Sequence, residues 1–147
     1  MKFETIFQVL ILSLVISSCT VEPVAINYGQ DACHFCKMNI VDRQHAAELV
    51  TTKGKAYKYD AIECMVQDLH NWSESDIAFY LITDYDSPGT LIDARKATYI
   101  ICEDIPSPMG ANLSGFELVN KAEQILNHKK GELYSWSALR KHMDQSK

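Results

Sequence analysis

The sequence lacks the motifs of common catalytic sites, and it lacks an excess of positive charge. Its 147 residues contain no G-x-S-x-G elbow, no glycine-rich phosphate loop and no H-E-x-x-H zinc motif, and no acid/base pair of carboxylates can be named. The formal net charge of -5 would repel nucleic acid and offers no polybasic patch to a membrane surface. We therefore expect neither an enzyme nor a nucleic-acid-binding protein.

The cysteine pattern also lacks what two familiar uses of C-x-x-C require. Cys33 and Cys36 have this spacing, but Cys64 and Cys102 are solitary, so a zinc knuckle has no second pair. A thioredoxin-like site needs a helix after the motif to lower the pKa of the first thiol, and "KMNIVDRQH" has no cap and an extended pattern. Disulfides stay open, because four cysteines in an exported chain permit three connectivities.

The first 18 residues have the pattern of a secretory signal peptide. Lys2 precedes an apolar run, residues 6–16, that is too short to span a bilayer. The stretch that ends at Cys19 resembles a bacterial lipobox, so we expect cleavage before Cys19 and acylation of that cysteine. The predicted division is residues 1–18 as signal peptide, 19–30 as a tether with proline and glycine, and 31–147 as the folded domain.

The remaining chain predicts a single α+β domain. A hydrophobic content of 47% with 22% charged residues is ordinary for one globular core. The predicted elements are strands at 46–51, 55–59 and 77–84 with a helix from 60 to about 72, then strands at 98–102, 113–118 and 132–136 with a helix at 120–131 and a short helix at 137–143. Asp60 with Glu63 has the pattern of a capping box, and Asn120 that of an N-cap. We therefore predict two similar β-β-α-β halves.

Two methionines raise the question of a soft metal. Met38 lies two positions after Cys36, so in an extended chain both side chains share a face, and a thioether suits Cu(I) better than zinc. The alternative, that Met38 is the inward side chain of a strand, stays open. Met109 lies in a loop between Pro108 and Gly110, where a plug over the core is the ordinary interpretation.

Two other side chains are candidate ligands of lower rank. His34 lies inside the cysteine motif and is a candidate auxiliary ligand. Cys64 lies beside the apolar stripe of the first helix, where an inert, partly buried thiol is the ordinary interpretation, and Cys102 alternates with Ile100 as a core residue.

Several stretches, taken in order, resemble the NosL lipoproteins, which are accessory proteins for copper-site assembly in nitrous-oxide reductase. These stretches are the lipobox at Cys19, "CHFCKMNI", "YDAIECM", "PMGANLSGF" and "GELYSWSAL". The resemblance implies that Cys36 and Met38 are the family's Cys-x-Met pair and that Met109 is the methionine of its Met-Gly loop, all three as Cu(I) ligands. It leaves Cys33 as an extra ligand or as a disulfide partner of Cys36.

The function implied by the resemblance is copper delivery. We expect an exported, periplasm-facing lipoprotein, anchored to a membrane by its acyl chain, that binds Cu(I) and passes it on. The implied partners are nitrous-oxide reductase and membrane-associated maturation proteins. Two alternatives stay open: a membrane-tethered thiol-disulfide oxidoreductase that uses Cys33 and Cys36, and a copper chaperone for another cuproenzyme.

Overall fold

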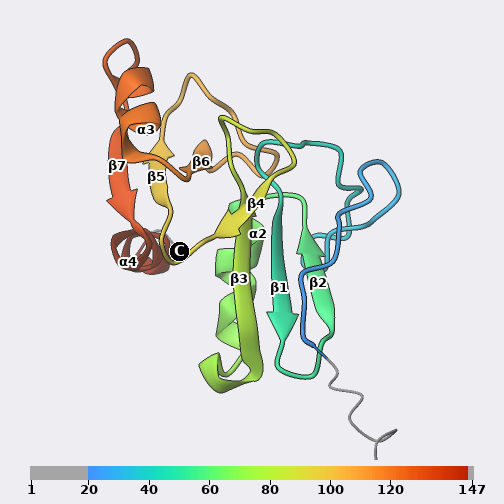
Figure 1. The fold of residues 1–147 in the computed structure, drawn as a ribbon. Coiled ribbons are helices and arrows are strands. Elements are labelled where there is room, and N and C mark those ends of the chain that lie inside the picture. Colours follow the sequence, from blue (N-terminus) through green and yellow to red (C-terminus); the bar gives the residue numbers. More distant parts are fainter. Residues whose placement is uncertain (1–19, 146–147) are drawn as a thin grey trace, which may run out of the picture.

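The structure, a computed structural model, describes residues 20–145 (Figure 1). The predicted signal peptide and Cys19 lie outside the described residues. Among the residues described, no helix has both the length and the apolar character that a membrane span requires.

The first sheet has the strand order β2-β1-β3-β4, and all of its pairings are antiparallel. Its strands are β1 (Ala47–Thr51), β2 (Ala56–Tyr59), β3 (Ile77–Thr83) and β4 (Leu91–Asp93), with α2 (Ile62–Asp68) and two short 3₁₀ turns, Leu69–Asn71 and Glu74–Asp76, between β2 and β3. β4 was not predicted, because three residues are too few to give an alternating hydrophobic pattern.

The second sheet repeats this arrangement with the order β6-β5-β7. Its strands are β5 (Thr98–Ile101), β6 (Leu113–Phe116) and β7 (Glu132–Ser135), with α3 (Val119–Leu126) before β7 and α4 (Trp136–Gln145) after it. In each half the first strand is central, the second and third flank it, and a helix joins those two. The prediction of two β-β-α-β halves in one α+β domain is therefore confirmed.

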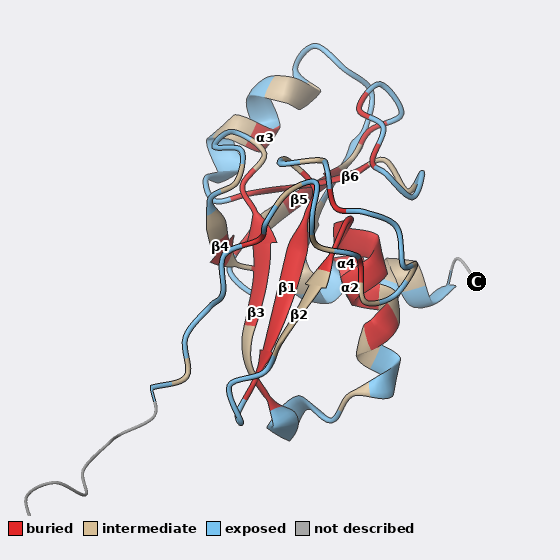
Figure 2. Cartoon of the chain, turned by 90° about the vertical axis from the view of Figure 1, so that its right-hand side faces the viewer, coloured by how far each residue is buried: buried red, intermediate tan, exposed pale blue. Residues whose placement is uncertain are grey.

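The core lies between α2 and the two sheets. Six of the seven α2 residues are buried, and the helix contacts β1, β2, β6 and α4 (Figure 2). β1 is buried along its whole length. Leu49 on this strand packs in the same apolar cluster as Ile62 and Met65 of α2, so one helix seals the first sheet and touches the second.

Both predicted helix caps are wrong. The N-cap of α2 is Ala61, without a side-chain hydrogen bond, and the N-cap of α3 is Leu118, so Asn120 lies inside the helix. Asp60 and Glu63 are buried and bind groups from distant loops instead. A buried carboxylate that accepts hydrogen bonds from a distant loop is not available to cap the N-terminus of its own helix.

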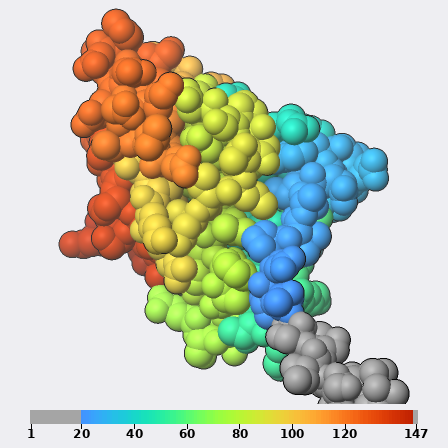
Figure 3. Space-filling model, in the orientation of Figure 1, coloured from blue at the N-terminus to red at the C-terminus, as the bar shows by residue number. Residues whose placement is uncertain are grey.

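The N-terminal segment lies against the first sheet (Figure 3). The Val24 N–H donates to Glu48 Oε1 at 2.8 Å, and Lys58 Nζ donates to the Ala25 carbonyl at 2.7 Å. Ile26 belongs to the main apolar cluster. Any free spacer within the predicted tether, residues 19–30, therefore has to precede Val24.

The contact between the sheets leaves no room for a side chain at Gly115 unless a neighbouring side chain shifts. A Cβ there would lie 2.2 Å from Ile82 Cδ1 and 3.4 Å from the tips of Ile62 and Tyr99. We expect Gly115→Ala to lower the free energy of unfolding by about 1–3 kcal/mol in urea titrations of the purified chain. In an Ile82→Val background, which lacks that Cδ1, the loss should be smaller; an equal loss in both backgrounds would contradict this packing.

Candidate metal site

The C-x-x-C motif lies on a tight loop that closes on itself. The Cys33 N–H donates to the Met38 carbonyl at 2.7 Å, and the Lys37 N–H donates to the Cys33 carbonyl at 3.0 Å. Lys37 has a φ of 68°, in the left-handed region. The extended chain assumed between Cys36 and Met38 is therefore wrong, and strand alternation does not place their side chains on one face.

One main-chain contact holds this loop against the first sheet. The His34 N–H donates to the Lys58 carbonyl on β2 at 2.7 Å. Two residues later, Asp60 follows the end of β2, and Cys64 lies in the first turn of α2. The loop and the β2–α2 corner thus face each other.

Four donor groups meet where the loop contacts that corner. The sulfur atoms of Cys33, Cys36 and Cys64 and a carboxylate oxygen of Asp60 all lie within 4.8 Å of one another. Cys33, Cys64 and Asp60 are at most 2% exposed, whereas Cys36 is half-buried. The four described cysteines are all free thiols. We call this group the cysteine cluster.

The dimensions of the cysteine cluster suit a metal ion. With metal–sulfur bonds of about 2.3 Å, the ligands of a tetrahedral site are about 3.8 Å apart and those of a trigonal site about 4.0 Å. The four donor atoms, which lie within 4.8 Å of one another, therefore need only small side-chain movements to reach these ligand distances. Three thiols select soft ions such as Cu(I), and thiolates also suit zinc.

Asp60 adds a buried negative charge to the cluster. The Cys36 thiol donates to Asp60 Oδ1 at 3.3 Å. Asp60 Oδ2 is buried and has no hydrogen-bond partner among the described residues. A buried carboxylate oxygen without a partner is costly, and a nearby cation would offset that cost. The sequence suggested Asp60 only as a cap, so its place in the cluster was missed.

The thiols divide into one acid and two hydrogen-bond donors. A hydrogen bond from Cys64 lowers the pKa of Cys33 to about 6, and the same contact raises the pKa of Cys64. Burial raises the pKa of Cys36 to about 11. Cys33 is therefore the most acidic thiol of the cluster, and metal binding to the other two thiols releases protons.

This division differs from that of a thiol-disulfide oxidoreductase. Such an enzyme needs a nucleophile with a low pKa that is partially exposed. Here the thiol with the low pKa, Cys33, is 1% exposed, and the accessible thiol, Cys36, has the raised pKa. No helix begins at the motif.

The other predicted ligands differ from the cysteines in exposure or in their contacts. The side chains of Met38 and Met109 are exposed, at 53% and 43%. The ring of His34 packs against Tyr57, with centroids 4.6 Å apart, and its Nε2 lies 4.0 Å from Asp68, so it is not in the group of donors. The structure therefore brings together Cys33, Cys36 and Cys64, and ligation by the two methionines stays a prediction.

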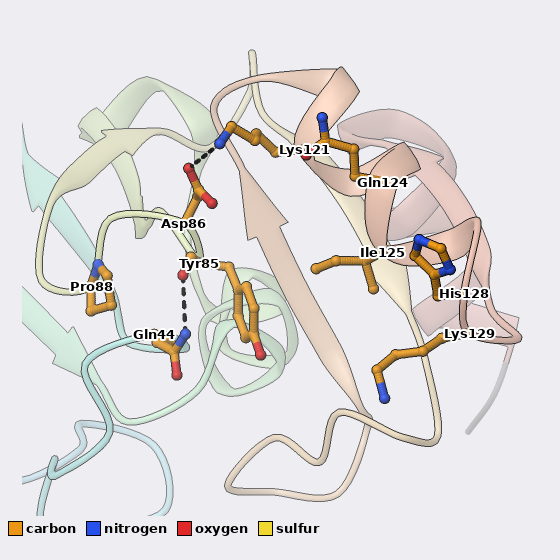
Figure 4. Close-up of a pocket in the computed structure, with 9 residues that line it drawn as sticks. All are labelled: Gln44, Tyr85, Asp86, Pro88, Lys121, Gln124, Ile125, His128 and Lys129. Carbon is orange, nitrogen blue, oxygen red and sulfur yellow. Dashed lines mark hydrogen bonds and ion pairs between the residues drawn. The ribbon is translucent and has the colours of Figure 1, made fainter.

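A cleft lies between α3 and the loop after β3 (Figure 4). This cleft of about 490 Å³ is lined by Gln44, Tyr85, Asp86, Pro88, Lys121, Gln124, Ile125, His128 and Lys129. Lys121 pairs with Asp86 at 3.0 Å, and Lys129 lies 3.7 Å from Asp104. Both lysines are thus already matched by carboxylates, and no residue of the cysteine cluster lines the cleft.

The fold and the cluster together define a small two-sheet α+β domain with a buried, thiol-rich site suited to a metal ion. The family model NosL matches residues 23–143, and the chain belongs to the NosL family. Its fold is similar to the crystal structure of the copper chaperone NosL from Shewanella denitrificans, with a TM-score of 0.69 at 20% identity over 80% of this chain and 95% of that chain. No curated protein matches the chain.

The protonation of the cluster can be measured directly. We expect the metal-free, reduced chain to gain one thiolate with an apparent pKa of about 6, seen as the short-wavelength ultraviolet absorbance of the thiolate. Cys33→Ser should remove this step, and Cys64→Ala should raise its pKa by removing the S–H donor. Cys102→Ser, in the second core cluster, should leave it unchanged. Survival of the step in Cys33→Ser would contradict the assignment.

Proposed function

We propose that this chain binds Cu(I) at the cysteine cluster and delivers it for copper-site assembly in nitrous-oxide reductase. The observation that carries the proposal is the meeting of three thiols within 4.8 Å in a chain of the NosL family. The fold similarity to a protein described as a copper chaperone supports it. The protein acts as a carrier, and its cargo is the metal ion.

Soft ligands explain why Cu(I) is the cargo. Thiolates and thioethers prefer Cu(I) over harder ions, and tight ligation by thiolates leaves little unbound Cu(I) in solution. In our proposal Cys36 is the central ligand, with Cys33 and Cys64 behind it. Met38 and Met109 add thioethers from the surface, where both side chains are exposed.

The gradient of burial suits release of the ion. Cys36 is half-buried, whereas Cys33 and Cys64 are at most 1% exposed, so an incoming ligand of a partner reaches the ion from the Cys36 side. Exchange of one ligand at a time keeps copper bound throughout the transfer. The proposed partners are nitrous-oxide reductase and the membrane-associated proteins of its maturation.

The location completes the proposal. We propose that the chain is exported and anchored through an acyl chain on Cys19, facing the periplasm. This anchor would keep the carrier at the membrane beside the maturation proteins and would limit the search for a partner to two dimensions. The sequence pattern before Cys19 supports it.

Copper affinity tests the site. In anaerobic competition with a Cu(I) chelator, we expect Cys36→Ser to weaken binding by more than the roughly 10–100-fold typical of a residue outside the ligand shell. Met38→Leu and Met109→Leu should also weaken it, because each removes a thioether without changing the charge. Cys102→Ser is the matched control and should bind as the wild type. Unchanged affinity in both Cys36→Ser and Met109→Leu would refute the site.

Delivery and anchoring need a cellular test. We expect cells that lack this chain to accumulate nitrous-oxide reductase with a reduced copper content, and the wild-type gene to restore it. Cys36→Ser should not restore it. Cys19→Ser should release the chain from the membrane fraction and prevent labelling by a fatty-acid analogue. Full copper loading of the reductase without the chain would leave copper binding intact but refute this partner.

A further inference from the structure

We infer that Glu63 is a positioning residue, whose carboxylate fixes the Met109 turn to the helix that carries Cys64. The inference rests on the proposed function, because it takes Met109 as a copper ligand. The geometry of the turn and of the carboxylate carries it.

Met109 lies in a hydrogen-bonded turn within a long loop. The Gly110 N–H donates to the Ser107 carbonyl at 3.0 Å, which places Met109 third in a four-residue turn. The loop runs from the end of β5 to β6 without strand or α-helix, and the Cys102 N–H closes its base on the Asn112 carbonyl at 3.0 Å. Apolar packing of Ile105 and Ala111 also holds this loop, and the turn has a further contact to a buried polar side chain.

Glu63 supplies the further contact. One of its oxygens, Oε1, accepts a hydrogen bond from the Ser107 hydroxyl and another from the Ala111 N–H at 3.4 Å. Ser107 and Ala111 lie on the two sides of Met109, so a single carboxylate oxygen spans the turn. Glu63 is also the residue before Cys64 in the first turn of α2. The Met109 turn and the Cys64 thiol are therefore fixed to the same backbone.

Stability alone does not explain a carboxylate at this position. Glu63 is 1% exposed, and its Oε2 is buried without a hydrogen-bond partner among the described residues. A buried carboxylate oxygen without a partner costs free energy, which an apolar side chain would not cost. A leucine would fill a similar volume but could not accept from Ser107 and Ala111. Only a side chain that accepts these two hydrogen bonds can fix the position of the turn.

A double-mutant cycle tests the inference on the full chain in detergent. We expect Glu63→Leu to lower Cu(I) affinity about tenfold or more, as for other residues that orient metal ligands. Because Glu63 acts through Met109, the Glu63→Leu/Met109→Leu double variant should bind Cu(I) no more weakly than the single variant Met109→Leu. X-ray absorption should show one sulfur fewer around copper in Glu63→Leu than in the wild type. Glu63→Leu also leaves the buried Ser107 hydroxyl and the Ala111 N–H without this acceptor, so we expect a lower thermal midpoint, and the affinity is measured well below it.

Two variants serve as controls. Glu63→Gln keeps an acceptor oxygen and should retain most of the affinity. Glu48→Leu is matched, because Glu48 is also a buried glutamate that accepts one backbone N–H and has one oxygen without a partner, but it binds Val24. The Glu48→Leu variant should bind Cu(I) with the affinity of the wild type. If Glu63→Leu does not fold, Ser107→Ala, which removes one of the two donors, should give a smaller loss that also disappears in the Met109→Leu background.

The outcomes separate this inference from the proposed function. Wild-type affinity in Glu63→Leu, losses that multiply in the double variant, or an unchanged sulfur count would overturn the role of Glu63. Wild-type affinity in Met109→Leu with a large loss in Cys36→Ser would also overturn it, while copper binding at the cysteine cluster would stand. Wild-type affinity in both Met109→Leu and Cys36→Ser would refute the copper site itself.

Discussion

The hydrogen bond from the His34 N–H to the Lys58 carbonyl is the contact on which the site depends. It docks the C-x-x-C loop at the end of β2, directly before the corner where Asp60 and Cys64 lie. The loop closes on itself through its own backbone hydrogen bonds, so its docking carries Cys33 and Cys36 together. Lys58 Nζ also donates to Asp31, two residues before Cys33, at 2.6 Å, so one residue of β2 holds this segment at two points. The cysteine cluster follows from that docking.

Buried carboxylates form a second layer of organisation around the first sheet. Asp60 accepts from Cys36, Glu63 holds the Met109 turn, and Glu48 holds the N-terminal segment. Each of the three has one oxygen that is buried without a partner among the described residues. Such groups lower the stability of the fold, yet each fastens a segment that has no regular structure of its own. The domain thus uses charged side chains where a loop has to be placed, and apolar ones where elements pack.

Much of the fold could be predicted from the sequence, because hydrophobic periodicity is local. The alternation around Leu49 and the helical spacing of Ile62 and Met65 were sufficient for the strand and the helix, and these residues do form the core. The failures lie at positions that the local sequence does not decide. Asp60, Glu63 and Asn120 have the composition of helix caps, but tertiary partners or a different helix start took precedence at each position. β4 was missed because its pairing with β3, rather than its three residues, makes it a strand.

The sequence by itself determined most of the strands and helices, their repetition as two halves, and the concentration of soft donors around Cys33 and Cys36. Only the tertiary structure decided which donors meet. Cys64 and Asp60 join the cluster, His34 turns to Tyr57, and Met38 and Met109 lie at the surface. The physical reason is that side-chain periodicity reports the neighbours along one element. The cysteine cluster instead lies at the contact between a loop and the β2–α2 corner, and no local pattern encodes that contact.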